Sequence, residues 1–385
     1  MDNSIQLSVI IVNYRVKYFL AQTLHSVIEA LEDIPNEIYV VDNNSGDDSV
    51  EYSKKLFPNV IFIENKENTG FAKANNQAIN LAKGKYCLIL NPDTVITREA
   101  ISAAIAKMES DSKCGAIGTK MIDGNGVFLP ESKRAFPTPW VSFCKIFGLS
   151  KLFPMSPRFA RYHLRYLSEK EEHKIEIMAG AYMVIRTGLL QKIDGFDESF
   201  FMYGEDIDLS YRITLKGYDN WYLPQPIIHY KGESTKKDSF KYVQVFYDAM
   251  LIFFRKHYPN YSAPYYIFVK TGIFVRAGVA MIKRAVGRLF GRKKQEIVSG
   301  NNWLLISDNA EDLKERIRKN YGNPEITEAE NIPENCNATD ILLDGRYLNY
   351  SQIVATLNEK SKANRNFHIY SSVCGVIITP KMNVL

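Results

Sequence analysis

The sequence SVIIVNYR (residues 8–15) joins a short apolar run to a polar cluster. The run at 8–12 has the near-continuous apolar character of a strand that is buried on both faces of a parallel sheet. Residues 17–32 follow with apolar side chains at helical spacing, and we predict an amphipathic helix there. A buried strand followed directly by such a helix is the opening unit of a parallel α/β sheet.

Three further strands are predicted before residue 100, at 38–41, 60–64 and 86–90, with helices at 48–57 and 72–82 between them. Polar residues stand shortly after each of the four strands: Asn13-Tyr14-Arg15, Asp42-Asn43-Asn44, Asn68-Thr69-Gly70 and Asn91-Pro92-Asp93. Turn formation alone could explain any one of these groups. Because the carboxyl ends of parallel strands meet at one edge of the sheet, four such groups favour a ligand site in a doubly wound domain.

A second polar group is the acidic sequence YGEDIDL (203–209), in which Glu205, Asp206 and Asp208 lie within four residues. Three carboxylates so close together repel one another unless a cation or a substrate offsets them, which suggests a function. The alternative is an acidic helix start, with Asp208 and Arg212 as an i,i+4 pair. If the helix begins near Glu205, then Glu205 and Asp206 project from its first turn and could accept a proton from an attacking hydroxyl.

Other residues have the chemistry to bind a nucleoside diphosphate. Asp93 can hold a divalent cation such as Mg²⁺ or Mn²⁺, with Asn91 as a neutral helper. His229 follows a predicted strand at 227–228 and could join that metal or contact a phosphate, although a lone histidine is more often structural. Gly70 would let the backbone approach a ligand at a helix start, where amide groups favour anions.

Seven motifs occur in a fixed order: SVIIVNYR (8–15), VVDNNSGD (40–47), NTGFAKANN (68–76), LNPDT (90–94), GAYMVIR (180–186), GFDESFFMYGEDIDLSYR (195–212) and HYKGEST (229–235). Together they resemble the family 2 glycosyltransferases of GT-A fold, in particular the bacterial rhamnosyltransferase and galactofuranosyltransferase branch. The resemblance implies an inverting transferase that moves a sugar from a UDP- or dTDP-sugar to a lipid-linked or other cell-surface glycan.

The resemblance also implies roles for single residues. Asp206 would be the catalytic base with Glu205 facing the acceptor, and Asp93 and His229 would hold Mg²⁺ or Mn²⁺. The chain departs from many relatives at Asn91, where they have the first Asp of the DXD motif, so the metal site loses one charge. The nucleotide-sugar site would comprise Asn13, Tyr14, Arg15, Asp42, Asn44, Asn68, Gly70, Phe71, Asn75, Asn91 and Asp93, with Asp42 on the uracil or thymine base.

We predict a GT-A catalytic domain at 1–260, a basic amphipathic segment at 261–295 and a small α/β unit of unknown role at 300–385. Residues 264–294 place apolar and basic side chains on different helical faces, as in a helix that lies in a membrane interface. A packed helix with a solvated basic face is the alternative. The loop-rich basic segment 130–175 could be acceptor-facing or a solvated linker.

The bulk properties favour a cytoplasmic protein, and with the basic segment we expect it to be peripheral at the inner face of the plasma membrane. No signal peptide or long apolar run is found, and the five cysteines lack metal spacing, which favours free thiols. A net charge of +5 does not point to nucleic acid. Two other functions remain open. A noncatalytic nucleotide-sugar-binding scaffold would not need a base, and a sugar nucleotidyltransferase would need a glycine-rich basic loop that 12–15 lacks.

Overall fold

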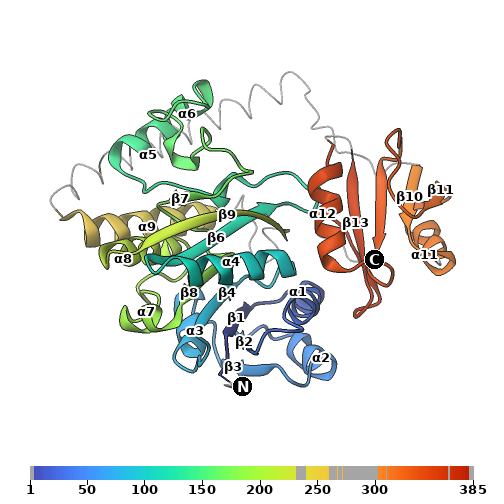
Figure 1. Ribbon diagram of the computed structural model, residues 1–385, viewed down its shortest axis with the longest axis horizontal. Coiled ribbons are helices and arrows are strands. Elements are labelled where there is room, and N and C mark those ends of the chain that lie inside the picture. The colour runs from blue at the N-terminus through green and yellow to red at the C-terminus, as the bar shows by residue number, and fades with distance from the viewer. Residues whose placement is uncertain are drawn as a thin grey trace.

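The computed structural model describes residues 4–230, 240–259, 267, 271, 302–308, 310–362 and 365–380. In Figure 1 the described residues form a large sheet flanked by helices and, to one side of it, a smaller sheet with its own helices. The α/β class and the small C-terminal α/β unit predicted from the sequence are therefore confirmed.

The N-terminal half of the large sheet is built from the four predicted strands, which are parallel and ordered β3-β2-β1-β4. Each predicted boundary lies within about three residues of the observed one, because strand and helix periods are clear in this region. The elements are β1 (Leu7–Asn13), α1 (Lys17–Ala30), β2 (Asn36–Asp42), α2 (Ser49–Leu56), β3 (Ile61–Glu64), α3 (Phe71–Ile79) and β4 (Tyr86–Leu90).

The other half of the sheet continues from β4 in the order β8-β6-β9-β5, with β7 paired to β9. The strand β8 begins at Tyr182, and just before it the Gly180 N–H donates to the Asp206 carboxylate at the start of α8. The elements are β5 (Thr94–Val95), α4 (Arg98–Ser110), β6 (Cys114–Ile122), β7 (His173–Ile175), β8 (Tyr182–Arg186), α7 (Thr187–Lys192), α8 (Glu205–Leu215), β9 (Asp219–His229) and α9 (Phe240–His257).

The basic segment between β6 and β7 is loop-rich and contains four short helices. They are η1 (Pro130–Ser132), α5 (Pro139–Ile146), α6 (Leu149–Leu152) and η2 (Arg161–His163). Thr138 caps α5 by accepting a hydrogen bond from the Val141 N–H, and Pro139 occupies the first helical position. In Figure 1, α5 and α6 stand outside the large sheet.

The C-terminal unit has a five-stranded sheet of order β11-β10-β12-β13-β14, of which only β14 is antiparallel. The strand β11 is a charged edge strand with three of its five side chains exposed. The elements are β10 (Asn302–Ile306), α11 (Glu311–Tyr321), β11 (Glu325–Ala329), β12 (Asp340–Asp344), α12 (Tyr350–Lys360), β13 (Asn366–Ser371) and β14 (Val376–Ile378).

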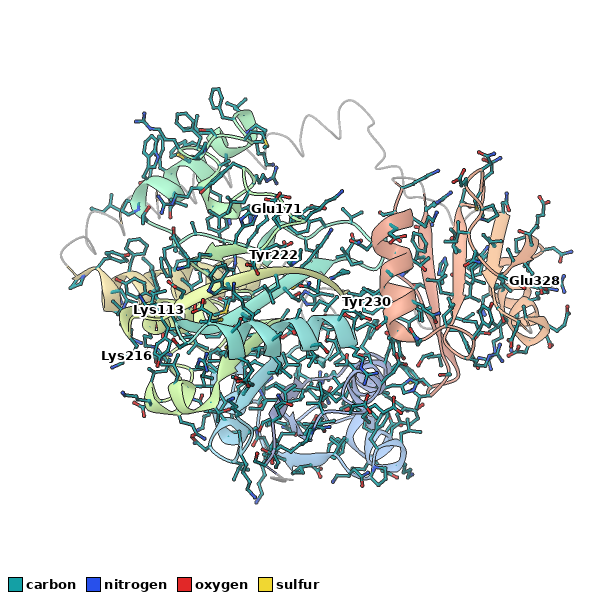
Figure 2. All side chains as sticks on the ribbon, in the orientation of Figure 1. Lys113, Glu171, Lys216, Tyr222, Tyr230 and Glu328 are labelled. Atoms are coloured by element: carbon teal, nitrogen blue, oxygen red, sulfur yellow. The ribbon has the colours of Figure 1, made fainter. Side chains whose placement is uncertain are left out.

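The C-terminal unit packs directly on the large sheet. Ile228 and Tyr230 at the end of β9 share one buried apolar cluster with Ile353 of α12, and Figure 2 places Tyr230 beside α12. Polar contacts border this cluster, because the Tyr350 hydroxyl lies 3.1 Å from His25 Nδ1 and the Tyr350 N–H donates to Glu29 at 2.7 Å. The unit therefore supports the strand end that carries His229.

The amphipathic helix predicted at 264–294 lies outside the described residues except at Ile267 and Thr271, so it stays a prediction. None of the helices in the described part of the chain combines the length and the apolar character that crossing a bilayer requires. All five cysteines are free thiols, as predicted.

Candidate active site

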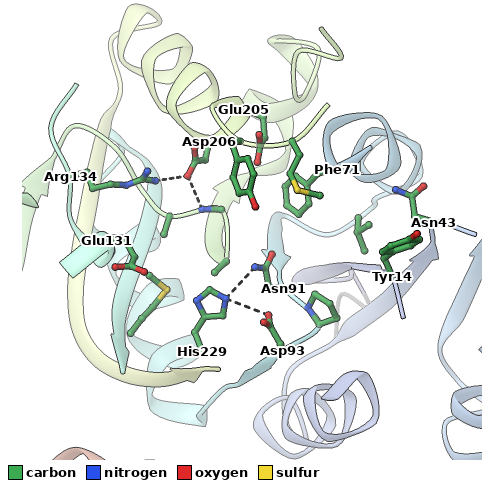
Figure 3. A pocket seen from close by; sticks show the side chains of 18 of the residues that line it. Tyr14, Asn43, Phe71, Asn91, Asp93, Glu131, Arg134, Glu205, Asp206 and His229 are labelled. Carbon is green, nitrogen blue, oxygen red and sulfur yellow. Dashed lines mark hydrogen bonds and ion pairs between the residues drawn. The ribbon is translucent and has the colours of Figure 1, made fainter. Parts of the chain in front are cut away.

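A cavity of about 310 Å³ opens at the carboxyl ends of β1 and β4, facing the start of α8 (Figure 3). Its walls come from both halves of the large sheet and from the segment after β6. The lining residues are Val12, Tyr14, Asn43, Asn68, Phe71, Asn91, Pro92, Asp93, Met121, Glu131, Arg134, Ala179, Gly180, Ala181, Met202, Tyr203, Glu205, Asp206 and His229.

Asp93 and His229 face each other across the cavity floor. Strand pairing fixes their positions, because Thr94 of β5 is in register with His229 of β9 and the Tyr230 N–H donates to the Asp93 carbonyl at 3.0 Å. Asp93 Oδ1 lies 3.4 Å from His229 Nε2, and Asn91 Nδ2 lies at the same distance from that nitrogen. Two neighbouring strands thus bring together a carboxylate, an imidazole and an amide.

This group has the chemistry of a partial metal site. The described residues hold no cluster of three or more His, Cys, Asp or Glu side chains able to bind a metal. However, Mg²⁺ is commonly held by only one or two carboxylates together with substrate phosphates. The Asp93–His229 pair therefore fits a cation shared with a bound diphosphate better than a cation enclosed by protein alone.

Asp206 lies on the opposite wall, in the first turn of α8, and is held at both carboxylate oxygens. The Arg134 guanidinium and the Gly180 N–H donate to Oδ2, and the Ile207 N–H donates to Oδ1 at 2.8 Å. Arg134 is fixed in turn because it also donates to the Met178 carbonyl at 2.7 Å. A carboxylate held in this way points a fixed oxygen into the cavity (Figure 3).

Glu205, directly before Asp206, has a different environment. Burial, followed by the neighbouring charge of Asp206, raises the pKa of the Glu205 carboxyl to about 8. At neutral pH Glu205 is therefore mostly protonated and can donate a hydrogen bond, whereas the Asp206 carboxylate accepts one from the Arg134 guanidinium. Two adjacent carboxyl groups in different environments are suited to different tasks.

Asp208, the third carboxylate of the acidic cluster, does not line the cavity. It is fully buried and accepts hydrogen bonds from Arg212 at 2.7 Å, Lys256 at 2.9 Å and His257 at 2.6 Å. Burial alone would raise its pKa, but these donors, led by His257, lower the pKa of Asp208 to about 2. The helical-pair alternative is thus correct for Asp208, which fastens α8 to α9.

We expect Asp208→Asn to lower the free energy of unfolding by about 3 kcal/mol, since it leaves the largely buried Arg212 guanidinium without its carboxylate partner. Because the folded pKa of Asp208 lies below its unfolded value of 3.8, its stabilisation is complete above that pH and is lost as the pH falls toward 2. Urea unfolding at pH 7 measures the change. Asp33→Asn, which breaks an exposed ion pair with Arg98, should cost less than about 1 kcal/mol. Equal effects of the two variants would contradict the role of Asp208.

Eight of the predicted site residues line the cavity: Tyr14, Asn68, Phe71, Asn91, Asp93, Glu205, Asp206 and His229. The other six lie outside its lining: Asn13, Arg15, Asp42, Asn44, Gly70 and Asn75. Asn13 and Asp42 bind each other, with Asn13 Nδ2 2.7 Å from Asp42 Oδ1. Arg15 donates to the Ser45 carbonyl, and Asn75 donates to the Phe71 carbonyl within α3.

Gly70 shapes the cavity from behind. Its φ is +85°, and a Cβ there would lie 2.6 Å from the Phe201 carbonyl oxygen, so no side chain fits. Asn43 fixes the same loop by donating to Asn68 Oδ1 and to the Gly70 carbonyl.

The site predicted from the sequence did not include Asn43, Glu131 or Arg134, although all three line the cavity. Asn43 could have been found, because it stands between two residues that were singled out at the end of β2. Glu131 and Arg134 gave no such signal. They belong to the basic segment after β6, and only the fold brings that segment to α8.

Comparison with known proteins gives one family match. Residues 8–193 match the model of glycosyl transferase family 2. N-acetylglucosaminyl-diphospho-decaprenol L-rhamnosyltransferase of Mycobacterium tuberculosis is 24% identical over 77% of this chain and 99% of its own length. The low-salt glycan biosynthesis hexosyltransferase Agl10 of Haloferax volcanii is 26% identical over 54% of this chain and 61% of its own length. The crystal structure of S. aureus TarS 1–349 superposes with a TM-score of 0.43 at 20% identity and covers 64% of each chain.

Proposed function

Because residues 8–193 match the model of glycosyl transferase family 2, we propose that the protein transfers a sugar with inversion from a UDP- or dTDP-sugar to a lipid-linked glycan acceptor. The observation that carries the proposal is the joint placement of Asp93, His229 and Asp206 around one cavity. The name of the mycobacterial relative, a rhamnosyltransferase acting on a lipid diphosphate, supports a rhamnosyl-like donor and a lipid-linked acceptor in cell-surface polysaccharide synthesis.

The donor would lie with its diphosphate on the cavity floor. Asp93 and His229 would hold a divalent cation, Mg²⁺ or Mn²⁺, which neutralises the charge that develops on the departing diphosphate. Tyr14, Asn43 and Asn68 at the ends of the parallel strands offer a ring and amides for the nucleoside. Tyr203 and Met202 lie on the side of α8, where the sugar would be enclosed.

Asp206 would act as the base. In an inverting displacement the acceptor hydroxyl attacks from the face opposite to the diphosphate, and Asp206 lies across the cavity from Asp93. Arg134 and the Gly180 N–H orient its carboxylate, so one oxygen can take the proton of the hydroxyl as the new bond forms. Protonated Glu205 would donate a hydrogen bond to the acceptor beside it.

The two alternatives explain less of the cavity. A noncatalytic scaffold has no need for a carboxylate oriented by a guanidinium and an amide. A nucleotidyltransferase would need a glycine-rich basic loop at the end of β1, and residues 12–15 there (Val-Asn-Tyr-Arg) contain no glycine. The experiment that tests the proposal is a screen of UDP- and dTDP-sugars with Mn²⁺, measuring release of the nucleoside diphosphate in the presence of bacterial lipid extract. Release from none of them would contradict it.

We expect Glu205→Gln to keep activity at neutral pH within about tenfold of the wild type, because glutamine imitates the protonated carboxyl. In the wild type, activity should decline as the pH rises through about 8, where Glu205 ionises next to Asp206. The variant should lack that decline. Matched kcat–pH profiles from pH 6 to 9.5 measure both effects. A decline of the same midpoint in the variant would show that another group titrates there.

We also propose that the protein works as a peripheral protein at the cytoplasmic face of the membrane that holds its acceptor. A lipid-linked acceptor supports this location, since its reactive sugar stays at the bilayer surface. The basic segment predicted at 264–294 would contribute to this attachment.

A further inference from the structure

Large apolar side chains are concentrated on the surface of residues 139–159. Among the described residues, thirteen large apolar side chains are exposed, and five of them lie here: Trp140, Phe147, Leu152, Phe153 and Met155. Leu152 is 70% exposed and Met155 68%. We call this set of residues, which α5, α6 and the following turn carry, the 139–159 surface. An exposed apolar cluster of this kind marks an interaction site.

The aromatic rings of this surface are ordered by contacts with one another. The rings of Trp140 and Phe143 stack with centroids 5.7 Å apart, and those of Phe143 and Phe147 lie 4.7 Å apart. Trp140 Nε1 donates to the Arg158 carbonyl at 3.2 Å, which joins the start of α5 to the turn after α6. The exposed side chains therefore belong to a defined structure with a fixed outer face.

The charge of the region has a single sign. Residues 132–168 contain seven Lys and Arg and no Asp or Glu. Lys151 and Arg158 are exposed beside the apolar side chains, and the Arg158 guanidinium lies 5.5 Å from the centre of a Trp140 ring. Cations that border apolar and indole side chains match an anionic lipid surface, with phosphates outside and acyl chains beneath. Trp is enriched at that depth in membranes.

The 139–159 surface is connected to the cavity at both ends of its segment. Arg134, which holds Asp206, precedes it by only a few residues. The Ala135 N–H donates to the Tyr162 carbonyl, and the Ile177 N–H donates to the Arg134 carbonyl, so the outgoing and returning chains are tied together. The returning chain then forms the cavity wall at 179–181. A contact made by this surface is thereby placed close to the acceptor side of the cavity.

We propose that the 139–159 surface docks on an anionic phospholipid bilayer, with Trp140, Leu152 and Met155 among the headgroups. The proposal identifies the face of the enzyme that meets the lipid-linked substrate. It rests on the proposed function for the identity of that acceptor. The lack of any carboxylate in 132–168 favours lipid over a second copy of the chain, which would have to offer acidic groups to match.

The test is binding of the full-length protein to vesicles of phosphatidylcholine with phosphatidylglycerol and of phosphatidylcholine alone. Two double variants alter the surface. Leu152→Ser with Met155→Ser removes apolar side chains, and Lys151→Glu with Arg158→Glu reverses the charge. The matched controls are Leu81→Ser with Leu215→Ser, two exposed leucines elsewhere, and Lys113→Glu with Lys216→Glu. We expect preferential binding to anionic vesicles, weakened more than about tenfold in both surface variants and unchanged in the controls.

Trp140 gives a second readout at the surface itself. Of the three tryptophans, it alone is exposed, so its emission should shift to shorter wavelength on anionic vesicles and be quenched by brominated lipid. Trp140→Phe should abolish that shift. Binding of the surface variants equal to the wild type, or an unshifted Trp140 emission on bound vesicles, would overturn the proposal.

Failure of the docking surface can be distinguished from failure of the transferase function. Release of nucleoside diphosphate in detergent solution does not require a bilayer, so the surface variants should keep that activity. Loss of vesicle binding with activity kept supports the docking surface. If the protein binds vesicles but turns over no nucleotide-sugar, the proposed function is contradicted and the proposed docking surface is supported.

Discussion

Asp206→Asn is expected to lower kcat for sugar transfer by about 10²–10⁴-fold, because asparagine cannot accept the proton of the attacking hydroxyl. The side chain keeps its size, and its oxygen can still accept a hydrogen bond from Arg134 or Gly180. Affinity for the nucleotide-sugar should therefore change little. Steady-state transfer and calorimetric binding of the donor, measured on the same preparation, separate the two effects.

The matched control is Asp197→Asn, which changes an aspartate that lies before α8 and does not line the cavity. Its carboxylate binds Lys256 near the protein surface, so kcat should remain close to that of the wild type. Melting temperatures of both variants exclude unfolding as the cause of lost activity. Equal turnover by Asp206→Asn and the wild type would refute Asp206 as the base.

Asp93→Asn should have the second large effect. Replacing this carboxylate removes the negative charge from the proposed cation site, and the neighbouring Asn91 supplies none. We expect kcat/KM for the donor to fall by about 100-fold or more, with the Mn²⁺ concentration needed for half-maximal activity rising in parallel. A titration of activity against Mn²⁺ at fixed donor concentration measures both.

Asp47→Asn serves as the control for this variant, because Asp47 follows β2 and does not line the cavity. It should leave the response to Mn²⁺ unchanged. If Asp93→Asn also keeps the wild-type Mn²⁺ response, the cation is held elsewhere or is not needed. The departure at Asn91 makes this outcome especially informative, since Asp93 is the only carboxylate of the LNPDT motif.

The sequence was sufficient to predict the N-terminal half of the large sheet, strands β1 to β4. Strands β1 to β4 are buried on both faces or end at polar turns, and local periodicity determines such elements. It was less informative for β6 and β9, whose pairing joins residues about 100 positions apart. It was also insufficient to separate Asp208 from Asp206. Both lie in the same acidic run, but only tertiary contacts with α9 show that Asp208 is bound to Lys256 and His257.

The lining of the cavity could also be predicted only in part. Residues that follow a strand, such as Tyr14, Asn68 and Asp93, could be placed at the sheet edge because chain direction fixes that edge. A position near this edge does not determine whether a side chain faces the cavity. Asn13 and Asp42 lie near the edge but bind each other and do not line the cavity. Arg134 could not be found, since its contact with Asp206 spans 72 positions and no local pattern encodes it.

The most direct test of the central claim is a crystal structure with Mn²⁺ and an unreactive UDP- or dTDP-sugar analogue, with an anomalous difference map to locate the manganese. We predict a manganese peak between Asp93 and His229 that also contacts the diphosphate, with the anomeric carbon facing Asp206. A nucleotide bound away from this cavity, for example on the C-terminal unit, or a sugar whose anomeric carbon points away from Asp206, would contradict the account.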